Sequence, residues 1–181
     1  MRIVAGKYKA KQLFTPKTND VRPTLERTRE ALFSILYSKG VNFSQTDVLD
    51  VFAGTGAFGF EALSRGAKSV TFIDKDTKIT IKNAQLFPAD KEKIKIIKAD
   101  ATNIFNSTKQ YHLIFMDAPY SQGLTEKALE NLIKKDYIAT NALVLIETLK
   151  TEEIIFPATL ELCDERNYGI AKIRFFIFKK Q

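Results

Sequence analysis

One short stretch near the middle of the chain combines an apolar run with residues that can bind an amine. The run Leu113–Met116 predicts a buried strand, and Asp117, Ala118, Pro119 and Tyr120 follow it directly. Asp117 and the Ala118 carbonyl can accept hydrogen bonds from an exocyclic amino group, and Pro119 favours the extended conformation that turns this carbonyl outward. Tyr120 offers a flat face on which a base can stack. The stretch predicts a clamp for the amine of a nucleobase, with an ordinary Asp-x-Pro turn as the alternative.

A glycine-rich loop follows an earlier apolar strand at residues 47–52. Gly54, Gly56 and Gly59 have the spacing G-x-G-x-x-G, which lets a backbone approach a bound cofactor closely. Asp74 ends the next strand, twenty residues after Gly54, where an acidic residue can bind ribose hydroxyls. This spacing predicts a nucleotide-containing cofactor.

The charge of the loop distinguishes between two cofactors. Asp50 lies four residues before Gly54, and a NAD site has no need of a carboxylate beside the loop that receives the pyrophosphate. S-adenosylmethionine has a cationic sulfonium and no phosphate, so an acidic loop favours it. Asp100 follows the third apolar strand, 94–97, where it can meet an adenine amino group. A NAD-dependent or non-catalytic Rossmann protein remains the alternative at this point.

The order of these motifs resembles that of class I methyltransferases that act on amino nitrogens. Further segments resemble the RsmD family, the 16S ribosomal RNA guanine-N2 methyltransferases, over nearly the whole chain. These segments are Arg2–Gly6, Arg22–Thr24, Arg27–Phe33, Phe58–Ala67 and Tyr168–Gly169. The family has D-P-P-Y or D-P-P-F where this chain has Ala118 in place of the first proline. The Ala118 carbonyl is retained, but the loop is expected to be looser.

The resemblance implies that the chain transfers a methyl group from S-adenosylmethionine to the N2 of a guanine in 16S ribosomal RNA, within an assembling small ribosomal subunit and without a metal. The implied catalytic residues are Asp117, Ala118, Pro119 and Tyr120. The implied cofactor-binding residues are Asp50, Phe52, Ala53, Gly54, Thr55, Gly56, Asp74, Lys75, Asp100 and Ala101. Because related motifs occur in N6-adenine and other nucleic-acid amino methyltransferases, these enzymes remain the alternative.

Positive charge is concentrated at the beginning of the chain. Residues 1–39 contain nine Lys or Arg against three acidic residues, a net +6, whereas the whole chain carries +7. Such a concentration predicts contacts with phosphates. The predicted RNA-binding residues are Arg2, Lys7, Lys9, Lys11, Arg22, Arg27 and Arg29.

The elements that position these residues alternate along the chain. Strands are expected at 47–52, 69–74, 94–99, 112–117 and 142–147, with helices between most of them, and two further strands at 160–166 and 170–178. Alternation predicts an α/β, Rossmann-like fold with a mostly parallel seven-stranded sheet, helices on both faces and a C-terminal antiparallel hairpin. Residues 1–23 are expected to form a small basic β-hairpin arm, with strands at 2–5 and 12–14, and residues 24–181 the methyltransferase domain. A helix capped by Thr24 and another at 76–87 are also expected.

Bulk properties indicate a cytoplasmic protein. The chain has 181 residues, 45% of them hydrophobic and 27% charged, as in globular domains. No apolar run approaches 18 residues and no secretory signal is expected. The single cysteine, Cys163, and the single histidine, His112, predict neither a disulfide nor a metal site.

Overall fold

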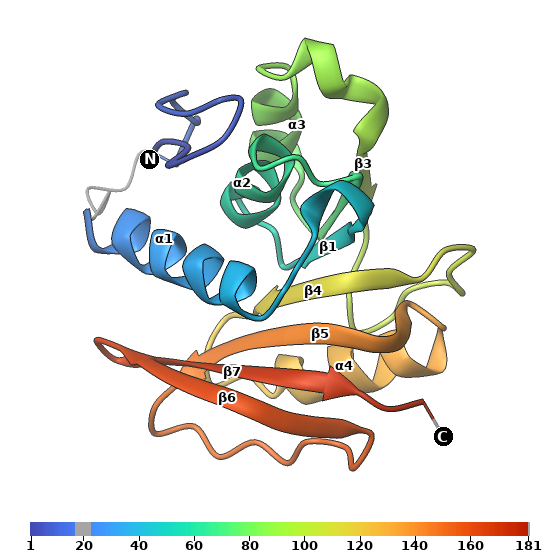
Figure 1. The fold of residues 1–181 in the computed structure, drawn as a ribbon. Helices are drawn as coiled ribbons and strands as arrows, with labels where there is room; N and C mark the ends of the chain where they lie inside the picture. Colours follow the sequence, from blue (N-terminus) through green and yellow to red (C-terminus); the bar gives the residue numbers. More distant parts are fainter. Residues whose placement is uncertain (17–22, 181) are drawn as a thin grey trace.

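The computed structural model describes residues 1–16 and 23–180, and these form a seven-stranded sheet covered by helices on both faces (Figure 1). The strands follow the order β3-β2-β1-β4-β5-β7-β6, in which β1 to β5 pair in parallel and β7 pairs antiparallel with both β5 and β6. The strands are β1 (Asp47–Val51), β2 (Ser69–Asp74), β3 (Ile94–Lys98), β4 (Tyr111–Asp117), β5 (Ile138–Leu149), β6 (Leu160–Tyr168) and β7 (Ala171–Phe178). The α-helices are α1 (Pro23–Ser38), α2 (Ala57–Ser64), α3 (Lys78–Ala84) and α4 (Leu124–Lys134), and the 3-10 helices are η1 (Phe43–Gln45) and η2 (Pro88–Lys93).

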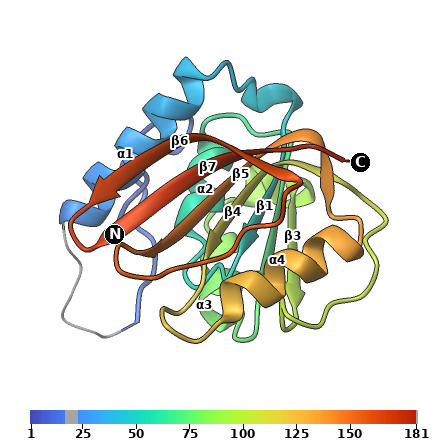
Figure 2. The same cartoon turned by 90° about the horizontal axis from the view of Figure 1, so that it is seen from below.

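Two apolar cores lie on opposite faces of the sheet. Helices α1 and α2 pack on one face, where Phe33, Phe58 and Phe115 meet, and α4 packs on the other through Leu129 and Leu132. Figure 2 shows α4 on the side of the sheet opposite α1. Continuous apolar strands are expected for such a sheet, because a parallel strand is buried on both faces.

The strand order places a topological switch point between β1 and β4. From β1 the chain proceeds outward to β2 and β3, and then returns to the other side of β1 with β4 and β5. The connections diverge at this point, and a crevice opens at the carboxyl ends of these strands. Asp117 closes β4 there, and the glycine loop leaves β1 there.

The expected fold class is confirmed, with differences at several ends. Helix α1 begins at Pro23, one residue before the expected cap Thr24, which agrees with the preference of proline for the first turn. The helix expected at 76–87 is present as the shorter α3, and the separate 3-10 helix η2 follows from Pro88. No helix of the described residues is long and apolar enough to cross a membrane.

The N-terminal segment differs most from expectation. The two strands expected at 2–5 and 12–14 are reduced to one bridge between Arg2 and Gln12. The backbone amides of Val4 and Ala5 donate instead to the buried carboxylate of Glu61 on α2, at 2.8 and 3.0 Å. The segment is thus held by α2 and also by its own pairing, in which the amides of Ile3, Ala10 and Leu13 donate to the carbonyls of Lys11, Ile3 and Met1.

Candidate active site

The glycine loop turns sharply between β1 and α2. Phe52, Gly54 and Gly56 all have positive φ angles, of 60°, 54° and 75°. A side chain at Gly54 would meet nothing within 4 Å, so this glycine borders open space. A Cβ at Gly56 or Gly59 would instead lie 2.6 or 2.3 Å from an aromatic ring, of Phe60 or Phe72 respectively. Only the first of the three glycines therefore faces the site, and the other two permit close packing.

Two carboxylates hold this loop by accepting backbone amides. Asp50 accepts from Gly59 N at 2.9 Å, and Asp74 accepts from Gly54 N at 2.8 Å and from Asp76 N at 2.9 Å. Asp50 is 2% exposed. Burial raises the pKa of Asp50 to about 8, against the lowering effect of the Gly59 hydrogen bond, and nearby Asp74 raises it further. Asp74 remains partly exposed.

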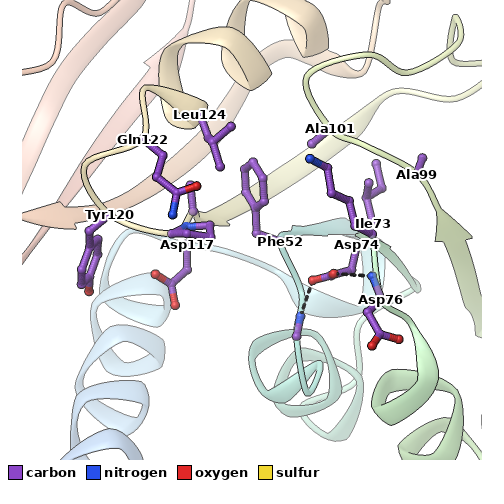
Figure 3. A pocket seen from close by; sticks show the side chains of 14 residues that line it. Phe52, Ile73, Asp74, Asp76, Ala99, Ala101, Asp117, Tyr120, Gln122 and Leu124 are labelled. Carbon is purple, nitrogen blue, oxygen red and sulfur yellow. Dashed lines mark hydrogen bonds between the residues drawn. The ribbon is translucent and has the colours of Figure 1, made fainter.

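A cavity of about 610 Å³ opens beside the loop (Figure 3). Asp74 and Asp76 lie at one end of it, Asp117 and Tyr120 at the other, and the Phe52 ring between them. The predicted cofactor-binding residues that line it are Phe52, Gly54, Asp74, Lys75 and Ala101. Asp50, Ala53 and Thr55 border a second cavity, described below, and Gly56 and Asp100 line neither.

Asp100 lies at the edge of the first cavity, next in the chain to two of its lining residues, and its side chain is already hydrogen-bonded. Its carboxylate accepts from the backbone N and the hydroxyl of Thr102, at 2.9 and 2.7 Å, and pairs with Lys75 at 2.9 Å. The Thr102 and Lys75 hydrogen bonds lower the pKa of Asp100 to about 2. The Asp100 side chain thus forms an Asx turn with Thr102. The neighbouring residues Ala99 and Ala101 line the cavity wall.

A second cavity, of about 450 Å³, adjoins the first. It lies between α1, the glycine loop, the carboxyl ends of β4 and β5, and the turn between β6 and β7. Four residues line both cavities, namely Phe52, Gly54, Asp117 and Tyr120. The tetrapeptide at the end of β4 therefore stands where the two cavities meet.

Glu147 joins this tetrapeptide, although the sequence reasoning does not identify it. It pairs in register with Asp117 across β4 and β5, and its Oε1 accepts from the Tyr120 hydroxyl at 3.0 Å. An acidic residue near the end of a buried parallel strand is the signal that would have found it. Ala118 is buried and Pro119 exposed in the same loop.

The acidic side chains at the strand ends have shifted pKa values, in part because they lie close together. Asp117 is open to the cavities, and the protein that surrounds its carboxyl group, with nearby Glu147 and Asp50, raises its pKa above the ordinary value. Burial also raises the pKa of Glu147, although the Tyr120 hydrogen bond opposes this. Burial and these carboxylates raise the pKa of Tyr120 as well. Such perturbed groups around a cavity are typical of an active site.

The structure corrects the predicted phosphate contact of Arg29. This side chain is 6% exposed, pairs with Glu61 at 3.4 Å and donates to the Arg2 carbonyl, so it stabilises the N-terminal segment. Arg2 pairs with Glu26 at 3.0 Å and Lys7 with Asp90 at 2.7 Å.

The remaining basic residues of the predicted set are Lys9, Lys11, Arg22 and Arg27. None of the ion pairs among the described residues involves Lys9 or Lys11. Arg27 is exposed on α1, and Arg22 lies outside the described residues.

Comparisons with known proteins concern the family and the fold of the chain. The model of the family described as conserved hypothetical protein 95 matches residues 1–177. A Haemophilus influenzae protein named ribosomal RNA small subunit methyltransferase D is 32% identical, over 97% of this chain and 93% of its own. An Escherichia coli structure described as a candidate methyltransferase has a TM-score of 0.85 at 28% identity, covering 100% of this chain and 99% of the other.

A more distant structure shows the fold alone. The N-methyltransferase NodS from Bradyrhizobium japonicum, in complex with S-adenosyl-L-homocysteine, has a TM-score of 0.66 at 14% identity and covers 91% of this chain and 92% of its own. The family match and the relative named above confirm the resemblance drawn from the motifs. The chain belongs to the family described as conserved hypothetical protein 95, the RsmD family of methyltransferases.

Proposed function

We propose that this protein transfers a methyl group from S-adenosylmethionine to the exocyclic N2 of a guanine in 16S ribosomal RNA, within an assembling small ribosomal subunit in the cytoplasm. The names of its relatives support ribosomal RNA as the substrate. One observation carries the chemistry. Asp117 and Tyr120 line both cavities, so an amine held by them in the second cavity would face a cofactor in the first.

The first cavity fits S-adenosylmethionine. The open space beside Gly54 admits a ligand against the backbone, and the partly exposed Asp74 carboxylate can accept hydrogen bonds from ribose hydroxyls. Ile73, Ala99 and Ala101 supply an apolar wall suited to an adenine ring. When bound, this cofactor supplies an electrophilic methyl group on a sulfonium centre.

The protein's own part in the reaction is to position and activate the amine. The N2 lone pair of guanine is delocalised into the ring, so the amine is a poor nucleophile. Hydrogen bonds from the amine to Asp117 and to the Ala118 carbonyl localise the lone pair and aim it at the first cavity, while Tyr120 stacks on the base. Asp117, which lines both cavities, is placed to accept the proton that leaves the amine. The target base must be turned out of its stack.

The substrate is tested by mapping methylated nucleotides in 16S ribosomal RNA. Cells that lack the gene should lose N2-methylguanine at one position, the wild-type gene should restore it, and Asp117→Asn should reduce the rate of restoration about 10²- to 10³-fold. Loss of N6-methyladenine instead would favour the alternative methyltransferase class, and unchanged ribosomal RNA would contradict the proposal.

The cofactor is tested by calorimetry. The purified protein should bind S-adenosylmethionine and show no comparable affinity for NAD. Because the reaction needs no pyrophosphate site, a preference for NAD would contradict the assignment of the first cavity.

A further inference from the structure

Glu147 is a carboxylate beside the proposed amine clamp to which the reaction assigns no role. Adjacent strands of a sheet lie about 4.8 Å apart, and residues in register have side chains on the same face. Glu147 is the register partner of Asp117, so the two carboxylates stand side by side at the ends of β5 and β4. Glu147 lines the second cavity but not the first, which places it on the side of the base and not of the cofactor.

The carboxylate of Glu147 can accept more hydrogen bonds than it receives within the described residues. Its Oε1 accepts from the Tyr120 hydroxyl, and no other hydrogen bond or ion pair among residues 1–16 and 23–180 involves its carboxylate. A partly buried carboxylate without a cation is costly unless further donors reach it. The same cavity wall contains Asp50, Asp117 and Arg29, and the Arg29 guanidinium pairs with Glu61 and with the Arg2 carbonyl, not with Glu147. A ligand that presents N–H groups would therefore be favoured here.

The Watson–Crick edge of guanine presents two adjacent donors, the N2 amine and N1–H. If Asp117 receives the amine, the neighbouring carboxylate is placed to receive N1–H. Adenine presents a lone pair at N1. Because this nitrogen and a carboxylate oxygen are both acceptors, they would repel each other and no hydrogen bond could form. A site that hydrogen-bonds one base strongly disfavours an analogue that lacks the matching donor, because its own polar group is left unpaired.

We propose that Glu147 selects guanine by accepting a hydrogen bond from N1–H of the target base, with Tyr120 holding the carboxylate in place. The inference rests on the proposed function and names the residue that makes it specific for guanine. It also distinguishes this site from that of an N6-adenine methyltransferase, for which an acceptor at this position would be unfavourable.

The test uses 2-aminopurine, which keeps the N2 amine of guanine but has a lone pair at N1 and no oxygen at position 6. Two 16S ribosomal RNAs are compared, one with guanine and one with 2-aminopurine at the nucleotide that the wild-type protein methylates. The full-length wild-type protein should prefer guanine. Glu147→Gln should lower kcat/KM for the guanine RNA about ten- to a hundredfold, the value of one charge-assisted hydrogen bond. It should lower the rate on 2-aminopurine far less, because a carboxamide N–H can donate to that lone pair.

The informative quantity is the ratio of the two kcat/KM values, since a general structural defect would lower both. Glu161→Gln on β6 is the matched control, because Glu161 is exposed and lines neither cavity, and its ratio should stay within about twofold of wild type. S-adenosylmethionine affinity, measured by calorimetry, should not change in either variant. An unchanged ratio in Glu147→Gln would overturn the inference while leaving the proposed function intact. Failure of the wild-type protein to methylate the guanine RNA would instead overturn the proposed function and this inference with it.

Discussion

At the scale of single residues, Asp50 combines burial with one hydrogen bond to the amide of Gly59. With a native pKa of about 8 and an ordinary value of 3.8, the folded protein retains a proton that the unfolded chain releases. The resulting stabilisation is fully present below about pH 4 and is lost as the pH rises through 8.

Asp50→Asn should remove this pH dependence, because the carboxamide oxygen still accepts the Gly59 amide and no charge forms. We expect the variant to exceed wild type in free energy of unfolding at pH 8.5 by about 1–3 kcal/mol, with a much smaller difference at pH 4. Urea unfolding at both pH values measures it. A variant that loses stability between these pH values as steeply as wild type would show that another group titrates.

Asp74 is the residue on which binding of the proposed cofactor should depend most. Asp74→Asn keeps an acceptor for the Gly54 amide but loses the charge that would pair with ribose hydroxyls. We expect S-adenosylmethionine affinity to fall by about 1.5–3 kcal/mol, measured by calorimetry. Asp136→Asn, on the loop before β5 and outside both cavities, is the matched control and should bind like wild type. Equal affinity in the two variants would place the ribose elsewhere.

The sequence is a good guide to which residues lie at the site. It is a poorer guide to the hydrogen-bond and ion-pair partners of each side chain. Asp74 and Asp117 are identified because each closes an apolar strand, and a parallel sheet brings such ends to one edge. The hydrogen bonds that Asp100 accepts come from a residue two positions later, and the partner of Arg29 lies 32 residues away. Composition and spacing do not determine such pairings.

At the scale of elements, the loop between β1 and α2 needs glycine at Gly54 for one reason, and α2 needs it at Gly59 for another. Gly59→Ala would place a methyl group 2.3 Å from the Phe72 ring, so we expect a loss of about 1–3 kcal/mol in stability. Gly54→Ala meets no atom but must adopt a positive φ, which costs about 1–2 kcal/mol, and its methyl group enters the first cavity.

Thermal unfolding and calorimetry separate the two variants. Gly59→Ala should melt at a lower temperature and, below that temperature, retain its affinity for S-adenosylmethionine. Gly54→Ala should bind S-adenosylmethionine more weakly even at temperatures at which the variant is fully folded. If Gly59→Ala weakened binding and left the melting temperature unchanged, the assignment of packing to Gly59 would be wrong.

The elements that the sequence predicts well are those with a local signal. The five parallel strands are apolar runs, and their positions agree with the structure to within a few residues. The N-terminal segment lacks such a signal, since the amides of Val4, Ala5 and Tyr8 are satisfied by Glu61 and Ser64, more than fifty residues later. Its expected hairpin was therefore longer than the bridge that forms.

At the scale of the whole molecule, the positive charges differ in how far they are already neutralised. At the C-terminal end, Lys172 and Arg174 both pair with Glu165, Lys179 lies 3.9 Å from Glu161, and Lys180 pairs with Asp136 at 2.8 Å. The N-terminal segment keeps an excess of positive charge, and Met1 of this segment lines the second cavity. RNA phosphates beside a base held in that cavity would therefore meet the N-terminal segment first.

The salt dependence of RNA binding tests this arrangement. Each phosphate contact releases counterions and adds about 0.7–0.9 to the slope of log affinity against log salt concentration. Replacing Lys9 and Lys11 together with Gln should therefore flatten the slope by about 1.4–1.8, if both contact phosphate, and leave S-adenosylmethionine affinity unchanged. Lys7 is better left in place, because its pair with Asp90 anchors the segment. The matched control, Lys179→Gln with Lys180→Gln, removes the same charge from paired positions and should change the slope less. If the control variant lost the larger share of the slope, RNA would lie against β6 and β7, and the N-terminal charges would serve only as solvated surface.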